Sequence, residues 1–197
     1  MAIDLYDKAL LDKLNNWTQN VDNLHIYGPN ETRRLFEVVA DTNNDKPIEL
    51  PLICVSRPLG FNIENPGKRV MSYDGLTLKA NIDKSLQLNA IPVNYSYQID
   101  IYTRYAEEAD EYARNFVFNF VNYNKLTISI PYNGVDYIHN AFVRLQEGVT
   151  DNSDVPERLI KGQFTRLTMG LDVFGAYLFD ARYRDNYVIS GDCEYSK

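Results

Sequence analysis

The chain has 197 residues, of which 45% are hydrophobic and 24% charged, as is typical of one globular domain, and its formal net charge at pH 7 is −7. This acidic balance argues against general nucleic-acid binding, because contacts with phosphates need clustered lysines and arginines. No apolar run approaches the ~18 residues of a membrane span and no signal-peptide pattern opens the chain, so we expect a protein made in the cytoplasm.

The N-terminal part is predicted to contain a helix followed by two strands. Residues 3–19 carry apolar side chains at helical spacing between charged ones. Residues 33–40 and 48–56 are predicted as strands joined by a polar loop. Pro51 and Pro58 make the second of these a poor central strand, so we expect it at a sheet edge or with a bulge.

Residues 57–90 are predicted to be a long excursion of loop and irregular hairpin. Asn65-Pro-Gly has strong turn chemistry, and Tyr73-Asp-Gly fits a tight hairpin turn. Long excursions from a compact domain are often functional. Since this one lacks catalytic residues, we expect it to contact other proteins.

The most regular pattern spans residues 91–132 and predicts a strand, a helix and a second strand. Side chains alternate between apolar and polar up to Thr103, with the period of two of a half-buried strand. Thr103 is predicted to cap a helix over 105–123, and a second alternating run begins at Leu126. One helix face is expected to be buried: Tyr105, Ala109, Tyr112, Ala113, Phe116, Val117, Phe120 and Val121.

The remaining sequence is predicted to be mostly strand. The pair Asn133-Gly134 is a strong signal for a two-residue hairpin leading into a strand over 137–145. Two further strands are predicted over 163–173 and 176–183, and residues 186–197 are either a short strand or a flexible tail. We therefore predict one α+β domain over residues 1–197, with a mixed, mostly antiparallel sheet packed by the 105–123 helix and the N-terminal helix.

Few residues suggest chemistry. Of the two histidines, His139 lies in a predicted strand and His25 where a loop meets a strand, so both are better explained by structural roles than by catalysis. Cys54 lies in an apolar run and is expected to be a buried thiol, whereas Cys193 lies in a polar segment. We expect no enzyme activity, no cofactor and no metal site.

Two clusters of acidic residues could suggest a metal or catalytic site, but structural roles explain them better. Asp151-Asn-Ser-Asp154 partly resembles a calcium loop but lacks its glycine and terminal glutamate, so a turn with local hydrogen bonds is favoured. The acidic residues of the 105–123 helix are expected on its solvent face near its N-terminus, where their negative charge interacts favourably with the positive end of the helix dipole. Phe118 lies away from the apolar stripe, and either a subunit contact or packing under a neighbouring loop would explain it.

Three segments together resemble a family of neck proteins of tailed bacteriophages. They are the strand ending in Ile101-Tyr-Thr, the helix containing Glu108-Ala-Asp-Glu-Tyr-Ala-Arg, and the run Lys125-Leu-Thr-Ile-Ser-Ile. The family comprises tail completion or tail sheath stabiliser proteins of contractile-tailed phages, related in fold to tail terminators. The likeness is closest over this unit and looser from residue 33 to residue 163. The helix departs from it at Phe116-Val-Phe-Asn-Phe-Val, where the family is richer in Leu and Ile and carries a proline.

The resemblance implies a virion protein, assembled in the host cytoplasm, that forms a ring, usually a hexamer. Such a ring caps the tail tube, stops its polymerisation, holds the last sheath ring and contacts neck or head-completion proteins. DNA passes through its lumen only as cargo, and no membrane is involved. The alternatives are a head-closure ring, another head–tail connector or a baseplate subunit, or, from a different class, a small cytoplasmic ligand-binding protein or enzyme.

A closed ring needs two different surfaces of one subunit to meet. We expect the strand near Pro51 and the 57–90 excursion to supply one surface, and the C-terminal strand and tail to supply the other. The predicted interface residues are Arg57, Phe61, Lys68, Arg69, Tyr73, Phe118, Asp151, Asp154 and Arg158.

Overall fold

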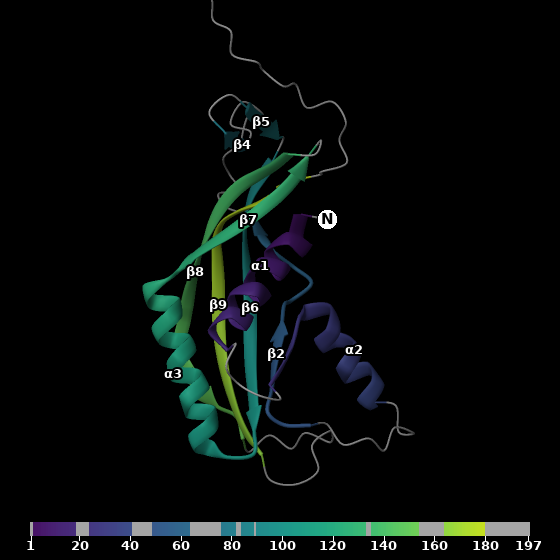
Figure 1. The fold of residues 1–197 in the computed structure, drawn as a ribbon. Coiled ribbons are helices and arrows are strands. Elements are labelled where there is room, and N and C mark those ends of the chain that lie inside the picture. Colours follow the sequence, from purple (N-terminus) through teal and green to yellow (C-terminus); the bar gives the residue numbers. More distant parts are fainter. Residues whose placement is uncertain are drawn as a thin grey trace, which may run out of the picture.

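A computed structural model describes residues 2–18, 24–40, 49–63, 76–81, 84–88, 90–132, 135–153 and 164–179 (Figure 1). The helices are α1 (Ala2–Trp17), α2 (Pro29–Ala40) and α3 (Ala106–Asn122). The strands are β1 (His25–Tyr27), β2 (Leu52–Ser56), β3 (Asn62–Ile63), β4 (Leu76–Asn81), β5 (Lys84–Leu88), β6 (Ala90–Thr103), β7 (Lys125–Tyr132), β8 (Val135–Asp151) and β9 (Thr165–Phe179).

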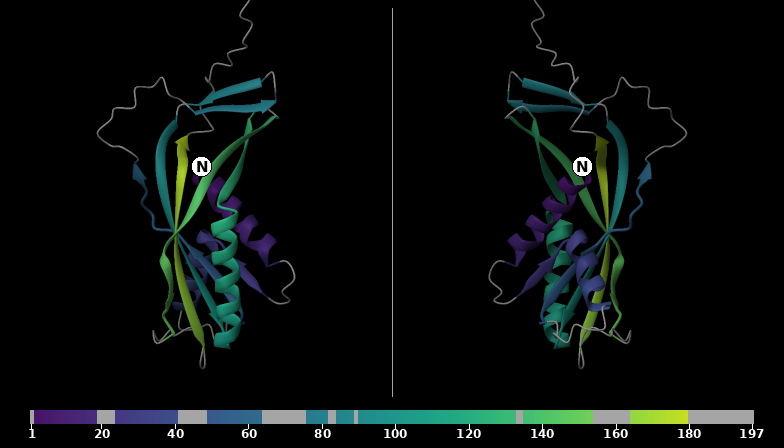
Figure 2. Two further views of the ribbon diagram at one scale, coloured as in Figure 1. Left: turned by 90° about the vertical axis from the view of Figure 1, so that its left-hand side faces the viewer. Right: turned by 90° about the vertical axis from the view of Figure 1, so that its right-hand side faces the viewer.

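The strands form one sheet in the order β1-β2-β6-β9-β8-β4-β5, with β3 also paired to β6 and β7 to β8. The β1–β2 pair is parallel and the other pairs are antiparallel. Helices α1 and α3 lie against one face of the long strands (Figures 1 and 2), and the Trp17 and Phe120 rings meet with their centroids 4.8 Å apart. The predicted α+β class, with a mixed and mostly antiparallel sheet, is confirmed.

The core lies between helices α1 and α3 and strands β2, β6, β7, β8 and β9 of the sheet. The alternation predicted for β6 is confirmed, because Val93, Tyr95, Tyr97, Ile99 and Ile101 are all buried. The second alternating run is confirmed as β7, whose Leu126, Ile128 and Ile130 are buried in the same cluster. The predicted Asn-Gly hairpin is also confirmed, since Tyr132 pairs with Val135 across two residues.

Residues 33–40 are helical, so the strand predicted there is wrong. They belong to α2, which begins at Pro29. Proline suits the first helical position because its missing N–H has no helical partner there. The Glu31 carboxylate accepts a hydrogen bond from the Gly28 N–H at 3.0 Å, and the Thr32 hydroxyl donates to the Tyr27 carbonyl at 3.1 Å. These local contacts outweigh the β preference of the valines that follow.

Strand β2 is not an edge strand, contrary to expectation. It lies between β1 and β6 in the sheet. Pro51 precedes its first residue and Pro58 lies beyond its last, so neither proline removes a hydrogen-bond donor from the ladder. The other face of β2 packs against α2, through a second cluster that includes Leu52, Cys54 and Leu35.

The start of α3 differs from the prediction. Tyr105 occupies the N-cap position without a side-chain hydrogen bond, and Thr103 is the buried last residue of β6. The Thr103 hydroxyl donates to the Tyr105 carbonyl at 2.7 Å, so it supports the turn rather than the helix end. The buried stripe is also narrower than predicted, because Tyr105 and Val121 are exposed.

Two strands are longer than predicted. β8 runs to Asp151, and β9 is one strand where two were expected. Gly175 has a φ of +64° and lies at an irregularity in the β6–β9 register, which lets β9 continue past the predicted break.

Within the 57–90 excursion, β4 and β5 form an antiparallel pair. The predicted turn at Tyr73 and the segment 186–197 lie outside the described residues. Among the described residues, no helix is both long and apolar enough to cross a membrane.

Candidate interaction surfaces

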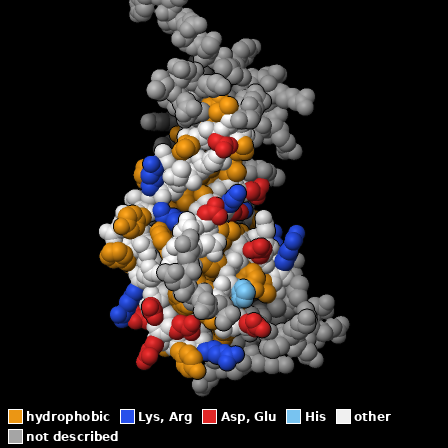
Figure 3. All heavy atoms as spheres, viewed as in Figure 1, with side chains coloured by type: hydrophobic (Ala, Val, Ile, Leu, Met, Phe, Trp, Pro, Cys, Tyr) orange, Lys and Arg blue, Asp and Glu red, His pale blue; other side chains and the backbone are white. Residues whose placement is uncertain are grey.

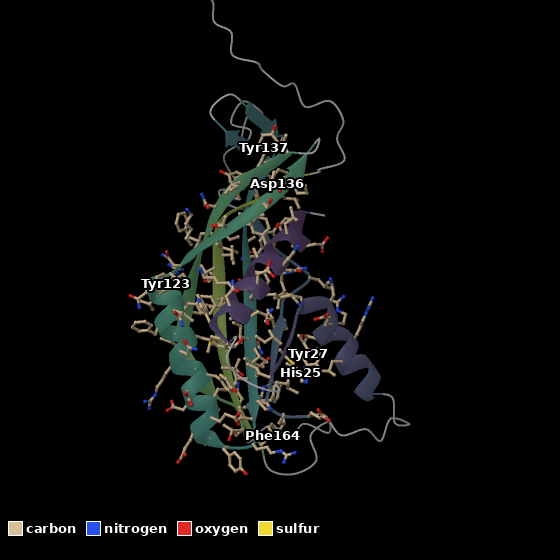
Figure 4. All side chains as sticks on the ribbon, viewed as in Figure 1. His25, Tyr27, Tyr123, Asp136, Tyr137 and Phe164 are labelled. Atoms are coloured by element: carbon tan, nitrogen blue, oxygen red, sulfur yellow. The ribbon has the colours of Figure 1, made fainter. Side chains whose placement is uncertain are left out.

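An exposed apolar strip lies at the C-terminal end of α3. Phe118, Val121 and Tyr123 are 65%, 68% and 61% exposed, and we call these three residues the α3 strip. Hydrophobic side chains gather over this end of the helix (Figure 3), and Tyr123 projects at its tip (Figure 4). Phe118 is two positions from both Phe116 and Phe120, which are buried, so the helical repeat turns it to the opposite side.

A groove of about 590 Å³ runs beside the α3 strip. Its apolar walls come from α3 and from Val149 and Leu167 of the two adjacent strands, while Asp110, Arg114 and Asp151 lie on its rim. Asp110 and Arg114 form an exposed ion pair at 2.6 Å. An apolar centre with a charged rim is the usual arrangement of a protein–protein contact.

Asp151 makes the local turn that the sequence favoured over a calcium loop. Its Oδ1 accepts hydrogen bonds from the Ser153 hydroxyl and from the Ser153 N–H, the latter at 2.9 Å. These hydrogen bonds lower the pKa of the Asp151 carboxyl because they favour its charged form. The residues that the structure describes contain no cluster of three or more His, Cys, Asp or Glu that could hold a metal ion. Asp154 lies outside them.

A second apolar surface follows β2. Leu59, Phe61 and Ile63 are exposed, and Ile63 belongs to the short strand β3 paired with β6. Figure 2 shows β3 and α3 on opposite sides of the molecule. The chain therefore presents two separate apolar surfaces that differ in sequence and in shape.

Arg57 has an internal role. Its Nε donates to Oδ1 of Asp7 at 3.1 Å, and the Tyr97 hydroxyl donates to the same oxygen at 2.7 Å. The Arg57 side chain is 12% exposed. The side chain of this predicted interface residue is therefore engaged within its own subunit, where it links the segment after β2 to α1.

The face of the sheet away from α1 and α3 carries a polar network. Asp100 accepts hydrogen bonds from Arg166, Thr168 and Gln98, at 2.7–3.2 Å. Asp172 accepts from Ser96 at 3.0 Å and from Gln146 at 2.8 Å. Part of this network lines a groove of about 1090 Å³, through Ser96, Gln98, Gln146, Thr168 and Asp172. Because the acceptors are already satisfied, the network is better suited to holding strand register than to activating a substrate.

The histidines and the described cysteine have the structural roles expected of them. His139 is buried, its Nε2 lies 2.9 Å from the Gly175 carbonyl, and burial lowers its pKa. His25 is at the start of β1, with its ring 6.3 Å from that of Tyr27 (Figure 4). Cys54 is a buried thiol in the α2 cluster, while Cys193 lies outside the described residues.

The structure separates the predicted interface residues. Phe61 lies on one apolar surface, and Phe118 and Asp151 border the other. Lys68, Arg69, Tyr73, Asp154 and Arg158 lie outside the described residues. Sequence reasoning missed Val121 and Tyr123, since it placed Val121 in the buried stripe. Val121 lies inside α3, and its helical spacing from the buried residues gave no sign that it would be exposed.

No protein-family model matches the chain, and a search of curated proteins finds no similar one.

Proposed function

We propose that this chain is a structural protein of a tailed bacteriophage virion, which forms a ring that terminates the tail tube or sheath and joins the tail to the neck. The proposal rests on the resemblance of the strand–helix–strand unit, now β6, α3 and β7, to the neck-protein family. The mechanism is binding and geometry, and it requires no chemical step.

The observation that carries the proposal is the pair of apolar surfaces on opposite sides of the subunit. One is the α3 strip with its groove, and the other contains Leu59, Phe61 and Ile63. Exposed apolar patches of this kind mark contacts with other proteins. A ring joins two different surfaces of neighbouring copies, which is the arrangement that two such patches support.

The acidic composition fits passage of DNA. A net charge of −7 would make a ring of several copies strongly negative, and such a surface repels phosphates. DNA would then be cargo in the lumen, as expected of a tail-terminating ring.

The test is a direct one. The purified chain is first examined by native mass spectrometry, where we expect one discrete oligomer, usually six copies in this family. It is then mixed with polymerising tail tubes and viewed by electron microscopy. Capped tubes of fixed length support the proposal, and tubes that elongate unchecked contradict it.

The nearest alternatives are a head-closure ring, another head–tail connector or a baseplate subunit. These would also form oligomers through the two apolar surfaces, so oligomerisation alone does not separate them. Binding to portal or head-completion proteins without capping of tubes would favour a connector. Binding only to the distal end of the tube would favour the baseplate.

A further inference from the structure

Strand β7 has one open edge. In the part of the chain that the structure describes, β7 pairs with β8 alone. The Asn124 carbonyl accepts a hydrogen bond from the Val143 N–H at 2.8 Å, and these two residues continue the β7–β8 register. Hydrogen-bonded and non-bonded pairs alternate along an antiparallel ladder. The backbone groups that point away from β8 therefore belong to Lys125, Thr127, Ser129 and Pro131.

Two contacts agree with this orientation and limit the open stretch. The Lys125 carbonyl accepts a hydrogen bond from the Lys13 ammonium at 2.7 Å, so it does face away from β8. Pro131 stands at an outward-facing position, where a residue without an N–H leaves no donor exposed. Between these two ends, the N–H and C=O groups of Thr127 and Ser129 are placed to pair with an added strand.

A groove of about 570 Å³ follows this edge, between β7 and α1. Leu5 and Ala9 supply its apolar wall, and its volume is within the usual range of binding pockets. Its charged lining residues are the cations Lys8, Lys13 and Lys125 and the anions Asp12 and Asp136. The groove is therefore slightly positive although the chain carries −7, so it favours an acidic segment.

The sequence contains a segment with the matching properties. Tyr187-Val-Ile-Ser is strongly strand-forming, and Asp192 and Glu194 follow it. Strand β9 ends beside α1, which forms one wall of the groove, because the Tyr177 N–H donates to the Tyr6 hydroxyl of α1 at 2.8 Å. From Phe179, an extended chain reaches residue 187 within about 30 Å.

We propose that the open edge of β7 accepts residues 187–190 of a second copy of this chain as an added strand. Backbone hydrogen bonds to Thr127 and Ser129 would give affinity, and the lysines would attract the acidic residues that follow. The choice of a second copy rests on the proposed ring, which needs a donor and an acceptor surface on each subunit. The β7 edge and the C-terminal segment are such a pair.

A cysteine pair tests the contact in the full-length chain. Thr127→Cys is combined with Ser190→Cys and Cys193→Ser, and mild oxidation is followed by non-reducing electrophoresis. We expect a ladder of covalently linked subunits that reductant removes. The control moves the first cysteine to the exposed Thr150 of β8, where no ladder is expected. A disulfide within one chain would identify the occupant as the chain's own tail, and either that result or no cross-link overturns the proposal.

Proline substitutions test the backbone pairing. Ser129→Pro removes an N–H that does not bond to β8, so the β7–β8 ladder is kept, and we expect the association constant between copies to fall at least tenfold. Ser129→Ala is the matched control and should associate normally. Should Ser129→Pro lower the folded fraction, the pair Val188→Pro and Ile189→Pro tests the same contact from the donor side, with threonines as controls. Proline variants that associate like their controls contradict the proposal.

The two proposals fail separately. Rings that cap tail tubes but give no cross-link between copies would overturn the strand contact and leave the virion role. Copies that cross-link through β7 but never cap tubes would overturn the virion role and leave the contact.

Discussion

The hydroxyl of Tyr97 on β6 donates a hydrogen bond of 2.7 Å to Oδ1 of Asp7 on α1. The same carboxylate accepts from Arg57 Nε at 3.1 Å and from its Nη2 at 3.4 Å. The side chains of Asp7 and Arg57 are 8% and 12% exposed. One buried carboxylate thus holds the N-terminal helix to the central strand and to the segment after β2.

Asp7→Ala should lower the free energy of unfolding by about 3 kcal/mol, because it leaves the Arg57 guanidinium largely buried without its partner. Tyr97→Phe should lower it by about 1–2 kcal/mol, since Arg57 still pairs with Asp7. Urea unfolding at pH 7 measures both. The control is Asp110→Ala, which removes an exposed ion pair and should change the value by less than about 0.5 kcal/mol. An Asp7→Ala effect no larger than that of the control would contradict the assigned role.

Three buried tyrosines should make the fold sensitive to alkali. Burial raises the pKa of Tyr6 and of Tyr97 above the ordinary value of 10.0, with the Asp7 carboxylate adding to the shift of Tyr97, and it raises the pKa of Tyr95 to about 12. The folded chain therefore holds these protons more tightly than the unfolded chain does. Their contribution is complete below pH 10 and is lost as pH rises through the folded-state values.

Urea unfolding between pH 9 and 12 should show this loss. The free energy of unfolding should fall above pH 10 by about 1.4 kcal/mol per pH unit for each such tyrosine. Tyr97→Phe should make this pH dependence weaker by the contribution of one tyrosine, about 1.4 kcal/mol per pH unit. Absorbance at the tyrosinate band would contradict the prediction if the folded wild-type chain titrated fully near pH 10.

The parts of the fold that the sequence predicts best have a burial pattern that repeats. The period of two in β6 and β7 matches a sheet with one face against the core, so each inward residue could be predicted. In α3, the stripe from Ala109 to Phe120 was predictable for the same reason, with a helical period. Its start was not, because no side chain caps Tyr105 and the chain turn there is fixed by the buried Thr103.

Tertiary contacts decided the rest. The strand predicted over residues 33–40 is a helix because of hydrogen bonds around Gly28 and because Leu35 packs on the far face of β2. The open edge of β7 depends on sheet order, which residue patterns do not specify. The inward turn of Arg57 depends on Asp7, a residue fifty positions earlier. Neither the order of the strands nor the Arg57–Asp7 contact leaves a periodic signal in the sequence.

Gly175 and Gly148 should be less replaceable than Gly60. Gly175 has a φ of +64° and Gly148 a φ of +125°, in each case at an irregularity of a strand register. A side chain at either position is strained even though no atom lies within 4 Å of its Cβ. Alanine at either should lower the free energy of unfolding by about 1–2 kcal/mol. Gly60→Ala also meets open space but has no positive φ, so it should be neutral. Equal effects at all three positions in thermal unfolding would contradict this account.

Phe116 and Phe118 lie two positions apart on α3, but only substitution of Phe116 should lower the free energy of unfolding strongly. Phe116 is fully buried, so Phe116→Ala should lower the free energy of unfolding by about 3–4 kcal/mol. Phe118 is 65% exposed, so Phe118→Ala should change the free energy of unfolding by less than about 0.5 kcal/mol.

Association should separate the same two residues. If Phe118 contacts a neighbouring subunit, its truncation should weaken association by more than about 1 kcal/mol, measured by sedimentation across a concentration series. Glu111→Gln, an exposed change on the same helix that removes no apolar area, is the control and should leave association unchanged. A Phe118→Ala chain as destabilised as Phe116→Ala would instead mean that Phe118 packs within its own subunit. In that case Phe118 would not be part of a surface that binds a neighbouring subunit.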